Sequence, residues 1–464
     1  MSDAQATKSD RTTQLGTKSI ASLLLRFSVP AIVGMMVQSL YNVVDRIFIG
    51  NGVGPLGLAG ATVSFPFMLV IMAFGMLIGI GGGSLLSISL GEGKKDFAES
   101  VINNAFVLII IISSSLMVCG LVFLDPLLRL TGASEAVLPY ARSYMRIILL
   151  GVMLNNIGFS MNNFIRAEGN PKIAMMTMLI GAILNTILDP IFIFIFDMGI
   201  AGAAWATIIS QAMSAIWVLS YFLSGKSHLT IDFKRMRLRK DVVLRIVAIG
   251  SAPFAMQIAA SALNTILNNQ LKTYGGDMAI SAMGIIYSVA MLILMPIFGL
   301  NQGSQPIIGY NYGAKQYKRV IRSVELTMMV ATFIVATGWL ATRLFPQFII
   351  SAFSRGNIEL VDIGTRAMRI FFFMFPFVGF QVVGASYFQA VGKPKHAMFL
   401  SLSRQVLLLI PLLLILPRFF GLDGVYGASP TADFLSSILT GIFFFLELRS
   451  LKKMPAVITA PIPD

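Results

Sequence analysis

The sequence predicts an all-α polytopic membrane protein in which twelve transmembrane helices form two pseudo-symmetric six-helix bundles. First, 56% of the 464 residues are hydrophobic and 12% are charged, whereas soluble domains contain about 25% charged residues. Second, apolar runs exceed the ~20 residues that cross the hydrocarbon core of a bilayer. Third, sequence patterns of the first half recur about 220 residues later.

The apolar runs are continuous rather than alternating, which favours helices and excludes a transmembrane barrel. In chain order, the predicted spans are 22–50, 56–90, 97–123, 137–165, 173–197, 200–224, 241–271, 277–311, 317–345, 360–391, 396–419 and 424–450. The predicted domains are a tail (1–21), a first lobe (22–225), a basic linker (226–240), a second lobe (241–450) and a second tail (451–464).

The repeat is clearest in two motifs. The pattern Gly79-x-x-x-Gly83-Ser84 recurs as Gly299-x-x-x-Gly303-Ser304, and Ala167-x-Gly169-x-Pro171-Lys172 recurs as Ala390-x-Gly392-x-Pro394-Lys395. A six-helix unit has an even number of spans, so both copies insert with the same orientation. We therefore expect the copies to be related by an axis along the membrane normal, with a cavity between them.

The net charge of +14 reflects topology rather than a nucleic-acid site. Of the loop and tail Lys and Arg residues, 22 lie on the side that holds both termini and 9 on the other. The positive-inside rule then places both termini in the cytoplasm. We expect the protein to lie in the plasma membrane. The polar start has no apolar stretch, so we expect no cleaved signal. The single cysteine, Cys119, excludes a disulfide framework.

A polar face in the first span is the strongest functional signal. Gly34, Gln38, Tyr41 and Asp45 are spaced four, three and four apart, and therefore share one face of a helix. A carboxylate inside a membrane helix costs at least ~2.5 kcal/mol and is a functional-site hypothesis by default. The alternative is an ion pair with Arg46, but adjacent helical residues point about 100° apart.

The fifth span adds Asn185 and Asp189, which are four residues apart and share a face. Pro190 has no N–H, so we expect a kink there and a free carbonyl at Thr186. Thr207, in the sixth span, supplies a hydroxyl. These oxygens suit small hard cations.

We expect two overlapping sets of residues at this site. The residues expected to couple ions are Gln38, Asp45, Asn185, Asp189 and Thr207, and those expected to hold a metal ion are Asp45, Asn185, Asp189 and Thr207. Two close carboxylates interact, so one should hold a proton near neutral pH. The coupling ion is therefore Na+ or H+, with no other cofactor. The neutral ligands favour Na+, with protons competing.

The second half keeps the polar face without its acids. Gln38 corresponds to Gln257 and Asp45 to Asn264, while Asn185 and Asp189 fall on the apolar run 406–412. Charge coupling is therefore expected in the first lobe. Asp433 either caps the last span or takes part in transport. The remaining acids of the second lobe are expected at the membrane interface: Glu325, Glu359, Asp362 and Glu447.

Substrate contacts are expected from flexible or aromatic side chains near the cavity, because methionine adapts to many shapes. The alternative is that these residues face lipid or a neighbouring helix. The candidates are Tyr41, Phe159, Met161, Asn163, Met256, Gln257, Tyr287 and Met291.

The chain resembles the multidrug and toxic compound extrusion (MATE) family, most closely its DinF- or MepA-like branch. The resemblance rests on the two lobes, Arg166-AEGNPK with its echo Gln389-AVGKPK, Leu184-NTILDPIFI and Pro430-TAD. It implies export of amphipathic, often cationic, drugs in exchange for Na+ or H+, and a first-lobe cation site similar to Asp45, Asn185, Asp189 and Thr207. We expect membrane lipid and small drugs as partners, no nucleic acid, a monomer, and no enzymatic activity.

Three other classes fit less well. A lipid-linked precursor flippase of the same superfamily needs several cationic residues in its cavity, and the intrahelical ones here are Arg26, Arg46, Arg245 and Arg404. A major-facilitator carrier would show a Gly-x-x-x-Asp-Arg-type loop where this chain has Gly91-EGKKD. An enzyme would need convergent His, Cys or acidic residues.

Overall fold

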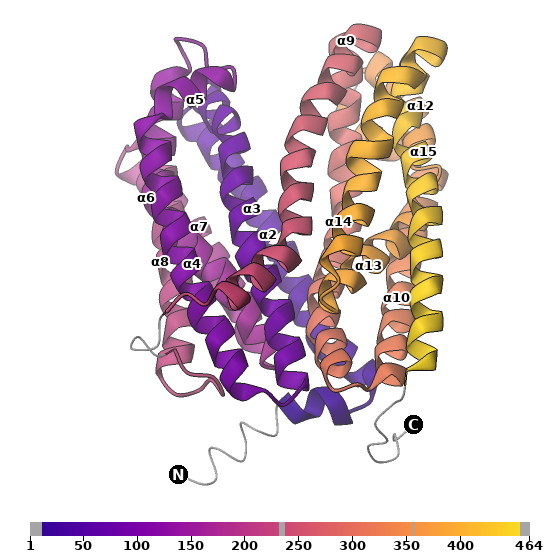
Figure 1. Cartoon of the computed structure of the whole chain (residues 1–464). Helices are drawn as coiled ribbons and strands as arrows, with labels where there is room; N and C mark the ends of the chain where they lie inside the picture. The colour runs from indigo at the N-terminus through magenta and orange to yellow at the C-terminus, as the bar shows by residue number, and fades with distance from the viewer. Residues whose placement is uncertain (1–11, 232–236, 355–356, 455–464) are drawn as a thin grey trace.

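The computed structural model describes residues 12–231, 237–354 and 357–454, and the described chain is helical without strands. Figure 1 shows two bundles side by side, with α2 to α8 in the N-terminal bundle and α9 to α15 in the C-terminal bundle. The helices of the N-terminal bundle are α2 (Ile20–Gly52), α3 (Pro55–Gly91), α4 (Lys95–Val122), α5 (Leu124–Leu130), α6 (Leu138–Ala167), α7 (Pro171–Pro190), the π-helix η1 (Ile191–Ile195) and α8 (Gly199–Leu223).

The C-terminal bundle repeats this order. Its helices are α9 (Lys240–Gly313), α10 (Tyr317–Leu344), α11 (Pro346–Ser354), α12 (Ile358–Phe371), α13 (Pro376–Ala390), α14 (Pro394–Leu402), the π-helix η3 (Ser403–Leu409) and α15 (Ile410–Lys453). Two of these helices contain a break, at Gly276 (φ 62°) in α9 and at Gly421 (φ 56°) in α15. Glycine is suited to both positions because it adopts positive φ without a steric penalty.

The expected twelve spans follow from these breaks. In the described chain, nine helices are long and apolar enough to cross a membrane, and the pair α12 and α13, bent by 53°, makes a tenth. Dividing α9 at Gly276 and the stretch from α14 to α15 at Gly421 adds two more. The predicted span 360–391 is thus a bent pair rather than one straight helix.

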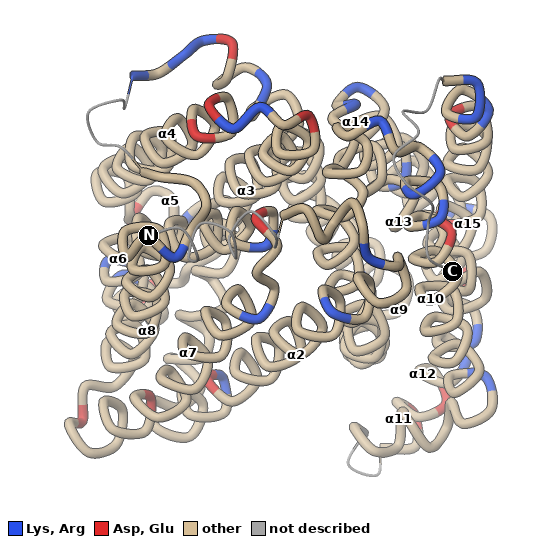
Figure 2. The backbone as a smooth tube through the Cα atoms, turned by 90° about the horizontal axis from the view of Figure 1, so that it is seen from below, with Lys and Arg blue, Asp and Glu red and all other residues tan. Residues whose placement is uncertain are grey.

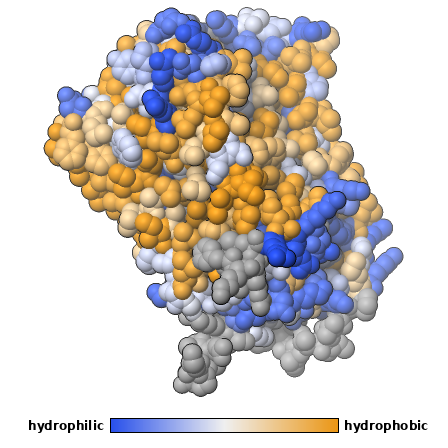
Figure 3. Space-filling model, turned by 60° about the vertical axis from the view of Figure 1, so that its left-hand side comes forward, coloured by the Kyte–Doolittle hydropathy of each residue, from blue (hydrophilic) through white to orange (hydrophobic). Residues whose placement is uncertain are grey.

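The surface has the character expected of a membrane protein. On the face in Figure 3, hydrophobic residues fill a broad middle band and hydrophilic residues gather toward its two ends. Large apolar side chains such as Ile111, Phe333 and Phe445 are exposed on the outer helices. Figure 2, which views the end where α2 begins and α15 ends, shows Lys and Arg mainly in connections and at helix ends. We call this end the terminal face.

The two bundles meet in the half of the molecule next to the terminal face and diverge away from it (Figure 1). Backbones touch there at glycines: a Cβ at Gly81 of α3 would lie 2.2 Å from the carbonyl oxygen of Ile246, and one at Gly303 would lie 2.7 Å from Cα of Ser28. Gly303 belongs to the repeated Gly-x-x-x-Gly-Ser motif. We call these contacts, with those of Gly91, Gly250, Gly299 and Gly313, the glycine seam.

Polar contacts reinforce the seam. Arg166 donates from Nη1 to Oε1 of Gln302 (2.7 Å), and Gln305 donates from Nε2 to Oγ of Ser84 (2.6 Å). Arg166, which begins the Arg166-AEGNPK motif, is buried, and its Nη2 donates to Oδ1 of Asn163 (2.9 Å). Backbone packing and hydrogen bonds therefore hold the bundles together on this side.

Candidate ion site

Three helices of the N-terminal bundle converge on one polar cluster. The helix α2 packs closely on α7 at Gly34, where a Cβ would lie 2.6 Å from Sδ of Met178. The helix α8 packs on the other side of α7, where Ser214 donates to the carbonyl oxygen of Thr177 (3.1 Å). These contacts bring the polar faces of α2, α7 and α8 together.

The centre of the cluster is a hydrogen-bonded triad. Nδ2 of Asn185 donates to Oδ1 of Asp189 (3.2 Å) and to Oγ1 of Thr207 (3.4 Å), and Thr207 donates to the carbonyl oxygen of Ala203 (3.0 Å). All three triad residues are buried, and Asp189 has 0% of its surface exposed. The sequence spacing of Asn185 and Asp189 thus predicts their contact correctly.

Asp45 of α2 completes the cluster, because it lies close enough to Asp189 for the two carboxyl groups to interact electrostatically. Arg46 does not form an ion pair with it in the described chain; its guanidinium lies over the ring of Phe65, 5.6 Å from the centroid. The two acids are therefore neighbours, and neither forms an ion pair with a described Lys or Arg.

Three acceptor atoms in the cluster are buried and accept no hydrogen bond from any described residue: Oδ1 of Asp45, Oδ1 of Asn185 and Oδ2 of Asp189. Leaving such an acceptor without a donor costs about 1–3 kcal/mol. A bound cation or a proton would satisfy these atoms, since both are attracted to carboxylate and amide oxygens. The arrangement is therefore suited to holding a small cation.

Two tyrosines border the acids. Nε2 of Gln38 donates to the hydroxyl oxygen of Tyr41 (3.2 Å), and Tyr41 lies within electrostatic range of Asp45 and Asp189. Tyr144 of α6 lies within range of the same two acids and is buried. Sequence reasoning misses Tyr144, because the register of α6 against α2 depends on packing between distant segments.

The chain does not simply kink at Pro190. Instead, α7 ends there and passes directly into the π-helix η1, and the amide of Ile191 donates to the carbonyl oxygen of Leu188. Single π-helical turns often occur at functional sites because they change the direction of nearby groups. The free Thr186 carbonyl stays a prediction.

The candidate substrate residues fall into different environments. Met161 is 0% exposed within the core of the N-terminal bundle, and Asn163 is buried and bound to Arg166. Met291 is 48% exposed. The remaining candidates are half-buried: Tyr41, Phe159, Met256, Gln257 and Tyr287. In this conformation Met161 is packed too deeply to contact a ligand.

Asp433 does not cap a helix. It lies inside α15, its side chain is 3% exposed, and it accepts a hydrogen bond of 2.6 Å at Oδ1 from Nε of Arg404 in η3. Glu447, near the end of α15, is buried and binds Nζ of Lys393 through both oxygens at 2.6 Å; its position at the membrane interface stays a prediction. The sequence gives no sign of either pairing, because the partners lie on different helices.

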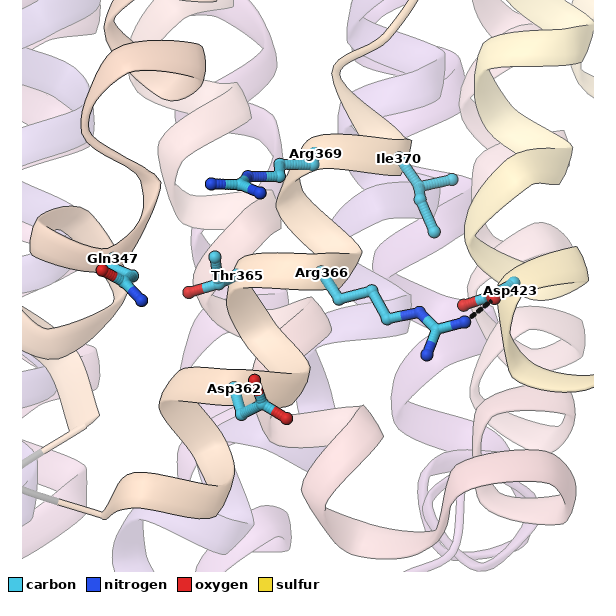
Figure 4. A pocket seen from close by; sticks show the side chains of 7 residues that line it. All are labelled: Gln347, Asp362, Thr365, Arg366, Arg369, Ile370 and Asp423. Atoms are coloured by element: carbon cyan, nitrogen blue, oxygen red, sulfur yellow. Dashed lines mark hydrogen bonds and ion pairs between the residues drawn. The ribbon is translucent and has the colours of Figure 1, made fainter.

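A separate pocket of about 470 Å³ lies among α11, α12 and α15. Figure 4 shows that Arg366 reaches Asp423 across it, while Asp362 and Arg369 lie on neighbouring turns of α12. None of the predicted ion or substrate residues lines this pocket. In the described residues, no group of three or more His, Cys, Asp and Glu side chains could hold a metal ion.

Two helical bundles of apolar spans, joined at one end and containing acids without a cationic partner, define a polytopic membrane transporter rather than an enzyme. The MatE family profile matches residues 30–191 and 253–415, so the chain belongs to the MatE family. This assignment agrees with the all-helical, twelve-span fold.

Similar proteins cover nearly the whole chain. The MATE multidrug transporter DinF-BH, solved in complex with a ligand, is 40% identical, covers 95% of this chain and 98% of that chain, and gives a TM-score of 0.88. The multidrug export protein MepA of Staphylococcus haemolyticus is 27% identical over 434 residues, or 93% of this chain and 94% of that protein. MepA of Staphylococcus aureus is 28% identical over 427 residues, or 91% and 93%.

Proposed function

We propose that the protein exports amphipathic, often cationic, small molecules from the cell in exchange for Na+. The observation that carries this proposal is the group of three buried acceptor atoms without donors on Asp45, Asn185 and Asp189. The names of its relatives, a multidrug transporter and multidrug export proteins, support the substrate class.

Na+ fits the site because two of its ligands are neutral. Asn185 presents an amide oxygen and Thr207 a hydroxyl oxygen, and neither is needed to carry a proton. The carboxylates supply the negative charge that offsets dehydration of the ion. Protonating either acid removes that charge, so protons compete with Na+ for the site.

The orientation follows from the distribution of basic residues, which puts the terminal face in the cytoplasm of a plasma-membrane protein. In that orientation the glycine seam closes the cytoplasmic side, and the divergent ends of the bundles face outward (Figure 1). Alternating access requires a second state in which the seam opens and the outer ends meet. Ion binding between α2 and α7 shifts this equilibrium only when the two states differ in ion affinity.

The test is drug efflux by purified protein in liposomes, under a Na+ gradient at equal pH and, separately, under a pH gradient without Na+. We expect the Na+ gradient to drive efflux. Asn185→Leu and Thr207→Val keep both acids but remove neutral ligands, so each should raise the Na+ concentration for half-maximal efflux by about ten-fold, the value of one ligand. Full-rate efflux on a pH gradient alone, unaffected by either substitution, would instead identify a proton site.

A further inference from the structure

The C-terminal bundle contains a second polar group, formed by Arg404 of η3, the buried Asp433 of α15 and the half-buried Tyr287 of α9. By helical rise, Arg404 lies about 15 Å from the start of α14 at Pro394, well inside the membrane span. A charged residue at that depth almost always faces the bundle interior or a water-filled opening, because exposure to lipid is unfavourable. Arg404 is therefore expected to face the bundle interior or a water-filled opening.

The pairing of Arg404 with Asp433 is incomplete. Only Nε of Arg404 donates to Asp433, at 2.6 Å, and this is the one hydrogen bond that the guanidinium makes within the described chain. In contrast, Arg142 uses both Nε (2.7 Å) and Nη2 (2.5 Å) to bind the two oxygens of Asp125. Two-pronged binding is the stable form of an arginine–carboxylate pair. The Nη1 and Nη2 ends of Arg404 are left uncommitted.

The uncommitted ends are not fully enclosed. The side chain of Arg404 is 28% exposed, whereas that of Asp433 is 3% exposed, and neither Nη atom of Arg404 is among the fully buried polar atoms that lack a partner in the described chain. Tyr287 lies within electrostatic range of both residues, and its hydroxyl makes no hydrogen bond to a described residue. Its ring packs edge-on against that of Phe371, with centroids 5.8 Å apart. The group thus combines free N–H and O–H donors with an aromatic wall.

These donors are suited to one kind of ligand group. Two adjacent Nη groups match the two oxygens of a carboxylate. Asp433 already neutralises the guanidinium, so a single negative charge fits better than a double one. The apolar ring beside the donors favours an amphipathic molecule over a small free anion.

We propose that Arg404 and Tyr287 form a subsite that binds the carboxylate of zwitterionic amphipathic substrates, with Asp433 positioning Arg404 and competing with the ligand for it. This inference rests on the proposed export function and assigns the C-terminal bundle a part in substrate recognition. The acids of the N-terminal bundle would then accept positive charge, and the C-terminal bundle would accept negative charge.

The test compares two probes that share one xanthene ring system: a cationic rhodamine ester and its free carboxylic acid, a zwitterion. Binding to purified protein is measured by fluorescence polarisation, and efflux is measured in proteoliposomes. Arg404→Gln should raise the ratio of the acid's Kd to the ester's Kd by at least about ten-fold, since the hydrogen bonds from both Nη groups to the charged carboxylate are lost. Arg404→Lys should restore part of the difference.

Asp433→Asn should act in the opposite direction and lower this ratio, because the competing carboxylate is gone. The double variant Arg404→Gln with Asp433→Asn has no buried charge left and should match Arg404→Gln, which keeps the test decisive if Asp433→Asn alone does not fold. Arg418→Gln removes an exposed arginine from the same span and is the matched control.

Equal loss of both probes in Arg404→Gln, or a wild-type protein that exports the ester but does not bind the acid, would overturn the inference. If wild-type protein exports the ester under no ion gradient, the proposed function itself fails. The two failures are therefore distinguishable.

Discussion

Each bundle contains one polar group built around a buried acid, and the two groups differ in the partner of that acid. In the N-terminal bundle, Asp189 lies next to η1 and interacts electrostatically with another acid, Asp45. In the C-terminal bundle, Asp433 binds Arg404, which lies in η3. The N-terminal bundle thus holds two acids that form no ion pair with a described residue, and the C-terminal bundle holds an acid that is ion-paired with an arginine of the same chain.

This difference bears on which bundle can exchange an ion. A free cation entering the N-terminal cluster gains interactions with oxygens that have no donor. At Asp433, an incoming cation must first displace a guanidinium that cannot leave, and separating a buried ion pair is strongly unfavourable. Duplication therefore supplied two similar frameworks, of which the N-terminal one is suited to reversible ion binding.

The largest effect expected from this comparison is the loss of coupling in Asp45→Asn and Asp189→Asn. Each change removes one charged ligand, worth ~1.5–3 kcal/mol, so gradient-driven efflux should fall by more than about ten-fold. Efflux is measured in proteoliposomes, with thermal unfolding of the purified variants as a check on folding. Wild-type efflux by either variant would show that the acids do not act together.

A smaller effect is expected at the glycine seam, where the two bundles touch and from which they would separate during alternating access. A Cβ at Gly303 would lie 2.7 Å from Cα of Ser28, and overpacking costs about 1–3 kcal/mol. Gly303→Ala should therefore increase the population with separated bundles, measured as the distance between spin labels placed across the terminal face.

Gly284→Ala is the matched control in the same helix, because a Cβ there meets nothing within 4 Å. It should leave the label distances unchanged. An identical distance distribution in Gly303→Ala would mean that the seam does not limit separation of the bundles.

The smallest effect is expected for Glu325→Gln and Asp362→Asn. Glu325 lines a shallow groove of α10 and Asp362 lines the polar pocket of Figure 4, both apart from the buried ion pairs. Surface substitutions of this kind change stability by about 0.5 kcal/mol or less, so efflux in proteoliposomes should change by less than about two-fold. A severe defect in either variant would require a second coupling acid outside the N-terminal bundle.

The sequence predicts the helices well because long apolar runs and their glycine breaks are local signals. The first span, predicted at 22–50, is Ile20–Gly52 in the structure. The contact between Asn185 and Asp189 is also local, since four residues make about one helical turn. The contact of Asp45 with Asp189 follows less directly, from two acids on inward faces of one bundle.

Other features depend on how distant helices pack. Arg404 and Asp433 are on different spans, so no spacing rule connects them. Tyr144 approaches the acids only because α6 packs against α3 and α8 in this register. Arg166 belongs to a polar motif of the first bundle, and its hydrogen bond to Gln302 forms only when the second bundle packs against it. The π-helices η1 and η3 likewise have no clear sequence signature beyond Pro190.

The most direct test of the central claim is equilibrium binding of radioactive Na+ to purified protein at low proton concentration. The account predicts saturable binding by wild-type protein, loss of that binding in Asp45→Asn and in Asp189→Asn, and retention in Asp433→Asn. Binding that survives both N-terminal substitutions but disappears in Asp433→Asn would contradict it, and would place the ion in the C-terminal bundle.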